Sequence, residues 1–170
     1  GGRRYGRRLM MPLPVVPQPF ADEPLGSWLG RLAGRYRFSV ADFNAHFGLG
    51  LDLGGPLAWL EPTMPTLASV DRIAALTRLP PPRVAALAHL SPSKGSADRV
   101  AYCERCVFLN HAELESPYWR AAWLDRRGET CAAEGRPLRW LRASQVRRCA
   151  NMPSLVRVVG RLERRRGRWQ

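Results

Sequence analysis

The chain contains almost no lysine, and it has few acidic residues, histidines and cysteines. All of its 27 basic residues except Lys94 are arginine, set against 14 acidic residues, 3 histidines and 4 cysteines. The acidic residues are mostly single and scattered, which argues against a nuclease centre built on two metal ions. No glycine-rich phosphate loop and no Ser/His/Asp arrangement stands out. We therefore expect a protein that is not an enzyme.

Long apolar runs are also missing from the sequence. No stretch of about 18 apolar residues exists that would form a membrane-spanning helix. The opening residues, GGRRYGRRLMMPLPVVPQPF, carry charges and then an apolar stretch that prolines interrupt, which makes a poor secretory signal. We expect an intracellular, cytoplasmic protein. In that compartment the cysteines indicate metal binding or redox chemistry more than structural disulfides.

What the sequence does have is a large excess of positive charge. The formal net charge is +13 over 170 residues, and a hydrophobic content of 45% with 6 tryptophans is enough to form a core. Arginine makes flat, bidentate contacts with phosphates, so we expect a polyanionic partner such as DNA. A GC-rich genome, which raises arginine and alanine together, would explain part of the same signal. The candidate nucleic-acid contacts are the arginines that cluster along the sequence: Arg35, Arg37, Arg147, Arg148, Arg164, Arg165, Arg166 and Arg168.

The pattern along the chain predicts a mainly α protein with a small zinc ribbon. We divide it into an extended basic, proline-rich arm (1–24), a helix-turn-helix-like helical domain (25–92), a zinc-ribbon domain (98–141) and a basic C-terminal tail (142–170). A packed bundle that contacts no DNA groove fits the helical domain equally well.

Local signals mark the helices of the second segment. The strongest helix begins at Leu25, and its spacing sets Arg31 on the polar face, opposite the apolar residues. Ser39 caps a second helix and Thr66 or Ser69 opens a third. Three prolines at 80–82 then separate the third helix from a fourth at 83–90, because proline is well accommodated in a first helical turn.

Three cysteines predict a metal site. Cys103 and Cys106 have the C-x-x-C spacing at which two thiolates face one ion from a tight turn, and Cys131 follows at a distance suited to the second loop of a zinc ribbon. Glu134 is the first choice for a fourth Zn²⁺ ligand, with His111 and Cys149 as alternatives. Free or redox-active cysteines without metal are the competing interpretation. A thioredoxin-like site is less favoured, because no βαβ pattern surrounds the motif.

The order of these motifs resembles one family. The stretch DEPLGSWLGRLA, from Asp22 to Ala33, resembles the opening signature of the TniQ family of transposition proteins. The motif YCERC at 102–106, the motif PYWR at 117–120, Trp123 and Cys131 follow in the family's order. The resemblance covers roughly residues 17–140. The family usually has histidine at the position of Glu134, which leaves the fourth ligand open.

The resemblance implies a non-enzymatic adaptor in Tn7-type and CRISPR-associated transposition. Such proteins join a target-selection module to a TnsC-like AAA+ ATPase regulator, which recruits the transposase. The length resembles that of the short TniQ proteins that sit on the end of an ATPase filament. Expected partners are therefore the ATPase, DNA and a CRISPR effector with its guide RNA. The alternative is a stand-alone helix-turn-helix DNA-binding regulator.

Overall fold

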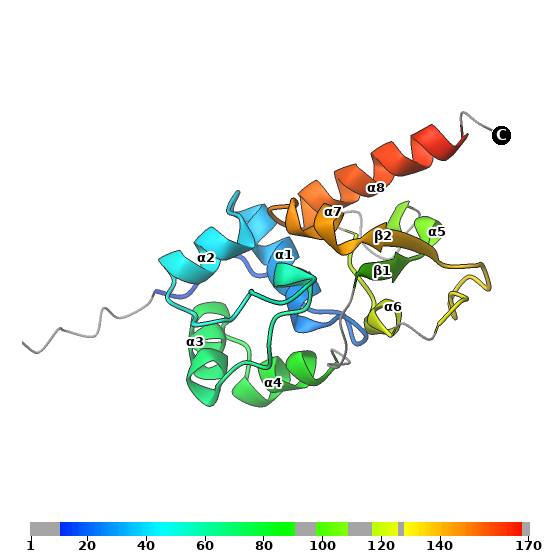
Figure 1. The fold of residues 1–170 in the computed structure, drawn as a ribbon. Helices are drawn as coiled ribbons and strands as arrows, with labels where there is room; N and C mark the ends of the chain where they lie inside the picture. Colours follow the sequence, from blue (N-terminus) through cyan, green and yellow to red (C-terminus); the bar gives the residue numbers. More distant parts are fainter. Residues whose placement is uncertain (1–10, 91–97, 109–116, 126–127, 168–170) are drawn as a thin grey trace, which may run out of the picture.

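A computed structural model describes residues 11–90, 98–108, 117–125 and 128–167 (Figure 1). None of the helices in these ranges is long and apolar enough to cross a membrane. The predicted mainly helical fold with a small sheet is confirmed. In chain order the elements are α1 (Leu25–Arg35), α2 (Val40–His46), the 3-10 helix η1 (Ala58–Leu60), α3 (Leu67–Thr77), α4 (Pro81–His89), β1 (Arg99–Tyr102), α5 (Glu104–Phe108), α6 (Ala121–Leu124), β2 (Arg139–Arg142), α7 (Ala143–Arg147) and α8 (Met152–Gly167).

The helix starts follow the local signals in the sequence. The Ser39 side chain accepts a hydrogen bond from the Asp42 amide at the start of α2, and Thr66 accepts one from the Ser69 amide at the start of α3. Helix α4 begins at Pro81, two residues before the predicted start, because proline fits the first helical turn. Local hydrogen bonding therefore explains the starts of α2 and α3, and proline explains the start of α4.

Part of the predicted arm lies against the folded body. Residues 11–24 form no helix or strand. The Leu13 amide donates to the Leu76 carbonyl at 2.9 Å, and the Trp28 indole donates to the Pro17 carbonyl at 2.8 Å. The proline-rich segment thus runs along the helices in extended form, as its composition predicts.

The two strands form a ribbon between segments about forty residues apart. β1 and β2 pair antiparallel with Val100 opposite Leu141 and Tyr102 opposite Arg139. Val100, Ala101 and Tyr102 are all buried. Because successive side chains point to opposite faces, both faces of β1 are covered. The pairing also brings the chain that follows Tyr102 close to the chain that precedes Arg139.

The segment predicted as a basic C-terminal tail (142–170) contains α7 and α8, which pack against the rest of the fold. Helix α8 packs against both α1 and α5, and Met152, Leu155 and Val159 are buried in the shared core. The segment before α8 is also tied down: the Trp59 indole donates to the Cys149 carbonyl at 2.7 Å, and the Val40 amide donates to Ala150. The apolar residues spaced through the basic sequence explain this, because they fall on one helical face. The predicted division near 91–97 falls outside the described residues and stays a prediction.

Two glycines allow α1 to approach η1. A Cβ placed on Gly26 would lie 2.2 Å from the Leu60 carbonyl oxygen, and one on Gly30 would lie 2.4 Å from the Trp59 ring. Both distances are far inside van der Waals contact. Glycine is therefore required where the backbone of η1 crosses the first helix.

We expect Gly26→Ala to lower the unfolding free energy by about 2–3 kcal/mol, because a methyl group cannot enter the contact without moving the backbone. Urea denaturation measures the change. Gly160→Ala in α8 is the matched control, since its nearest neighbour would be the flexible Arg164 side chain at 3.4 Å. The control is expected to be neutral or to stabilise by about 0.5–1 kcal/mol. Equal stability of the two variants would contradict this account of the α1–η1 contact.

Candidate metal centre and its supporting network

Three cysteine side chains meet in the core beside the ribbon. The sulphur atoms of Cys103, Cys106 and Cys131 all lie within 4.8 Å of one another, and all three residues are buried. The Sγ atoms of Cys106 and Cys131 are 3.6 Å apart, and none of the described cysteines forms a disulfide. The predicted grouping of these three residues is confirmed.

Short elements on both sides of the ribbon position the sulphurs. Cys103 directly follows β1, and the single turn of α5 returns Cys106 to the same side. Cys131 begins a tight turn in which the Gly135 amide donates to the Cys131 carbonyl at 2.7 Å. Gly135 has φ +62°, a conformation that glycine adopts without strain. Pairing of the strands then holds the two cysteine-bearing turns together.

The electrostatics of the thiols fit a cation. Burial and the neighbouring thiols of Cys131 and Cys103 raise the pKa of Cys106. Burial also acts to raise the pKa of Cys131, but hydrogen bonds from the backbone amides of Glu134 and Ala133 and from the other two thiols outweigh it and lower the pKa. A bound dication would favour the thiolate forms that bind metal.

The cluster therefore could hold a metal ion through three thiolates. In a tetrahedral site with bonds of about 2.3 Å, sulphur atoms lie about 3.8 Å apart, close to the observed Cys106–Cys131 separation. Three buried sulphurs are a donor set that suits a structural metal site. The residues present fit such an ion.

Among the described residues, neither Glu134 nor Cys149 joins the cluster. The Glu134 carboxylate forms an ion pair with Arg105 at 2.9 Å, so this residue supports the cluster through its backbone amide. Cys149 lies at the end of α7 and donates to the Gln145 carbonyl at 3.1 Å. His111 lies outside the described residues. The choice among these three stays a prediction.

A buried polar network joins the first helix to the segment that contains Trp119. The Ser27 hydroxyl donates to one carboxylate oxygen of Glu23 at 2.8 Å, and Arg31 donates to the other oxygen at 2.6 Å. The Ser27 oxygen also accepts the Trp119 backbone amide at 2.8 Å. We call Glu23, Ser27, Arg31 and the Trp119 amide the Ser27 network.

Burial is nearly complete for the charged members of the Ser27 network. The prediction that Arg31 lies on the polar face of its helix is wrong, because Arg31 is only 3% exposed and Glu23 is fully buried. Burial raises the pKa of Glu23 to about 7, and the Arg31 guanidinium, the Ser27 hydroxyl and the Phe20 amide act in the opposite direction. A buried charge of this kind persists only when it is paired, which the ion pair achieves.

The PYWR motif (117–120) supplies the partner of Ser27 in this network, the Trp119 backbone amide. Trp119 is fully buried, and its indole donates to the Ala101 carbonyl in β1 at 3.0 Å. Tyr118 donates to Asp22 at 2.9 Å, and Arg120 forms an ion pair with the same carboxylate at 2.7 Å. Both aromatic residues of the motif are buried. The motif thus connects the Ser27 network to the strand that leads into Cys103.

Glu23 was missed by sequence reasoning. The signal was present, since Glu23, Ser27 and Arg31 are spaced by four residues and so share one side of a helix and of the turn before it. When an acid and a base at that spacing share the side of a helix that also carries apolar residues, they indicate a buried ion pair.

The candidate nucleic-acid contacts lie on three helices. Arg35 and Arg37 are at the end of α1, and Arg147 and Arg148 are at the end of α7, where Arg147 also donates to the Pro56 carbonyl at 3.2 Å. The last described turns of α8 carry three more exposed arginines, and Arg168 lies outside the described residues. The three described pairs or runs are all exposed. Their contact with nucleic acid stays a prediction.

A comparison with protein families gives one result. The family model described as TniQ matches residues 14–150, a range that includes the Ser27 network and all three clustered cysteines. No match was found among curated proteins or among solved structures.

We expect wild-type protein purified without added metal to contain about one zinc per chain, and Cys103→Ser to contain less than about a tenth of that. Elemental analysis measures both. Cys149→Ser is the control, because it changes a buried cysteine outside the cluster. Full metal content in Cys103→Ser would refute the site, whereas metal loss from Cys149→Ser would identify Cys149 as a further ligand.

Glu23→Gln is expected to lower the unfolding free energy by at least about 2 kcal/mol, because the buried Arg31 guanidinium loses its carboxylate partner. Asp22→Asn removes the neighbouring carboxylate, whose side chain is 44% exposed, and should cost less than about 1 kcal/mol. Chemical denaturation of both variants at pH 8 makes the comparison. A smaller effect for Glu23→Gln than for Asp22→Asn would show that the buried pair is not a main source of stability.

Proposed function

The chain belongs to the TniQ family of transposition proteins, and from this premise we propose that it is a non-enzymatic adaptor that links target-site selection to an AAA+ ATPase regulator, TnsC-like, which recruits the transposase. The single observation that carries the proposal is the family match over residues 14–150. The proposed partners are the ATPase, DNA and a CRISPR effector with its guide RNA.

The burial of the family's motif residues supports a scaffold role for those motifs. Glu23, Ser27, Trp28 and Trp119 are buried, so they are occupied in holding the fold and have little surface to offer a partner. An adaptor would therefore bind its partners through other, exposed residues. This view fits a protein in which the shared motifs maintain the fold and the surface determines the partner.

Zinc is the metal that we propose for the cluster. Cys103, Cys106 and Cys131 would hold the ion, and its chemistry would be structural: it would tie the turn after β1 to the turn before β2. Thiolates in a tetrahedral arrangement are the donor set typical of structural zinc. The ion would keep the surface around these turns in a fixed shape for a partner.

The alternative function, a stand-alone helix-turn-helix regulator, has weaker support. Helices α3 and α4 pack together across a three-residue joint, which suits that motif. However, the exposed positions at the start of α4 are Pro81, Pro82 and Arg83, and Arg83 donates to the Pro19 carbonyl at 3.5 Å. Prolines offer no donors to base edges, so this helix has little with which to read a sequence.

The adaptor proposal predicts association with the cognate AAA+ regulator in a pull-down that varies DNA and ATP independently. We expect binding at least about tenfold above background with both present, with Cys149→Ser protein behaving as wild type. Absence of association under every condition would refute the proposal. Sequence-selective DNA binding that survives competitor DNA, in the absence of the ATPase, would instead favour the regulator.

A further inference from the structure

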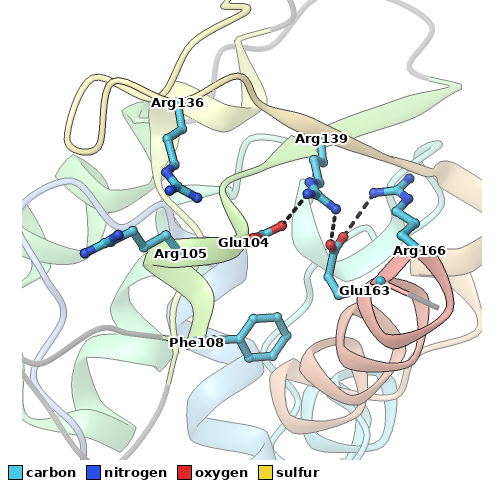
Figure 2. Close-up of a pocket in the computed structure, with 8 residues that line it drawn as sticks. Glu104, Arg105, Phe108, Arg136, Arg139, Glu163 and Arg166 are labelled. Carbon is cyan, nitrogen blue, oxygen red and sulfur yellow. Dashed lines mark hydrogen bonds and ion pairs between the residues drawn. The ribbon is translucent and has the colours of Figure 1, made fainter. Parts of the chain in front are cut away.

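A pocket lined by arginines lies beside the cysteine cluster, between α5, β2 and α8 (Figure 2). Its volume is about 350 Å³, near the lower end of the range for small-ligand sites. We call it the arginine pocket; its lining residues are Glu104, Arg105, Phe108, Arg136, Arg139, Glu163, Arg166 and Gly167.

Ion pairs fix the guanidinium groups on one side of this pocket. Arg139 bridges Glu104, at 2.7 Å, and Glu163, while Arg166 donates from Nη1 to Glu163 at 3.0 Å. The Tyr102 hydroxyl also donates to Glu163. Figure 2 shows the ion pairs of Glu104, Arg139, Glu163 and Arg166 as a chain across the pocket. Because Glu163 is held by three donors, it orients the two arginines and its own charge is largely compensated.

The pocket keeps an excess of positive charge after these pairs are counted. Four arginines line it against two glutamates, and including Glu134, which pairs with Arg105, still leaves one positive charge in excess. Within the described residues, the hydrogen bonds of Arg166 to Tyr102 and to Glu163 both use Nη1, which leaves Nε and Nη2 for a ligand. Arg136 extends into the same space from the turn before β2 (Figure 2). Such a setting favours an anion, and guanidinium groups suit phosphate in particular.

An aromatic ring lies on the wall of the same pocket. Phe108 is 45% exposed, one of the few large apolar side chains of the described residues with so much free surface. Its ring packs near Gly160 of α8, where an added Cβ would lie 3.7 Å from the ring. The ring therefore lies beside α8 and keeps an exposed surface. An exposed ring next to guanidinium groups is an arrangement that stacks a base while its phosphate is bound.

We propose that the arginine pocket binds one unpaired nucleotide, with its phosphate on Arg136 and Arg166 and its base on Phe108. The volume admits a single nucleotide and excludes a duplex. The nucleotide comes from a single-stranded DNA or RNA, or is free in solution; both sources present a phosphate beside an unpaired base. This inference goes beyond the adaptor role and does not depend on it, because it requires no ATPase.

Fluorescence anisotropy with a short labelled single strand tests the proposal on the full chain. The pocket variants are Arg136→Ala/Arg166→Ala and Phe108→Leu, and the control is Arg157→Ala/Arg161→Ala, which removes the same charge from exposed positions of α8 outside the pocket. A duplex of the same sequence and a nucleoside monophosphate as competitor form the other arms. Circular dichroism melting of each variant confirms that it is folded.

The double pocket variant is expected to weaken single-strand binding at least tenfold, and Phe108→Leu about fivefold, the low end for loss of one stacked base. The control double variant should change single-strand affinity less than about threefold. Affinity for the duplex should change equally in the pocket and control variants. The monophosphate is expected to compete at some concentration. If that concentration is lower than the single-strand concentration that gives half saturation, the free nucleotide is the ligand.

Equal losses for the pocket and control double variants would overturn the proposal, because they would show a general charge effect. So would unchanged binding in Phe108→Leu together with equal affinity for single strand and duplex. Association of the pocket variants with the ATPase is measured in parallel. A variant that loses the single strand but retains the ATPase, or the reverse, separates failure of this inference from failure of the adaptor role.

Discussion

The fold depends on one hydroxyl group that satisfies two partners far apart in the sequence. Ser27 donates to Glu23 and accepts the Trp119 amide, so it joins the start of the first helix to a segment 92 residues later. All of these groups are buried, and each would lose much more free energy unpaired than it gains paired. The Trp119 indole then bonds to Ala101 in β1, and the strand ends at Cys103. The position of the candidate metal centre thus follows from the Ser27 network.

The arginines of this protein lie in different environments and therefore have different functions. Arg31 is buried and neutralised by Glu23, where it supports the core. Arg139 is half-buried between two glutamates and organises a pocket. Arg157 and others on the outer side of α8 are exposed to solvent. Total charge therefore overstates the surface available to a polyanion, since the environment of each guanidinium decides whether it meets a carboxylate or a phosphate.

Features that depend on short-range chemistry could be predicted from the sequence. The caps at Ser39 and Thr66 require only a hydroxyl three residues before a free amide, and both were identified. The C-x-x-C pair likewise brings two sulphurs together within one turn, and Cys131 joined them as expected. The fourth ligand could not be chosen, because it depends on where Glu134 points, and an ion pair with Arg105 directs it elsewhere.

By itself the sequence determined the helical character, the starts of α1 and α2, the grouping of three cysteines and the family. Each of these rests on neighbours within a few residues or on an ordered set of motifs. Only the tertiary structure decided that Glu23 and Arg31 are buried as a pair, that the basic C-terminal segment packs into the core as α8, and that arginines from α5, β2 and α8 share a pocket. These features arise where segments distant in sequence meet, and periodicity within a single segment carries no information about its partner.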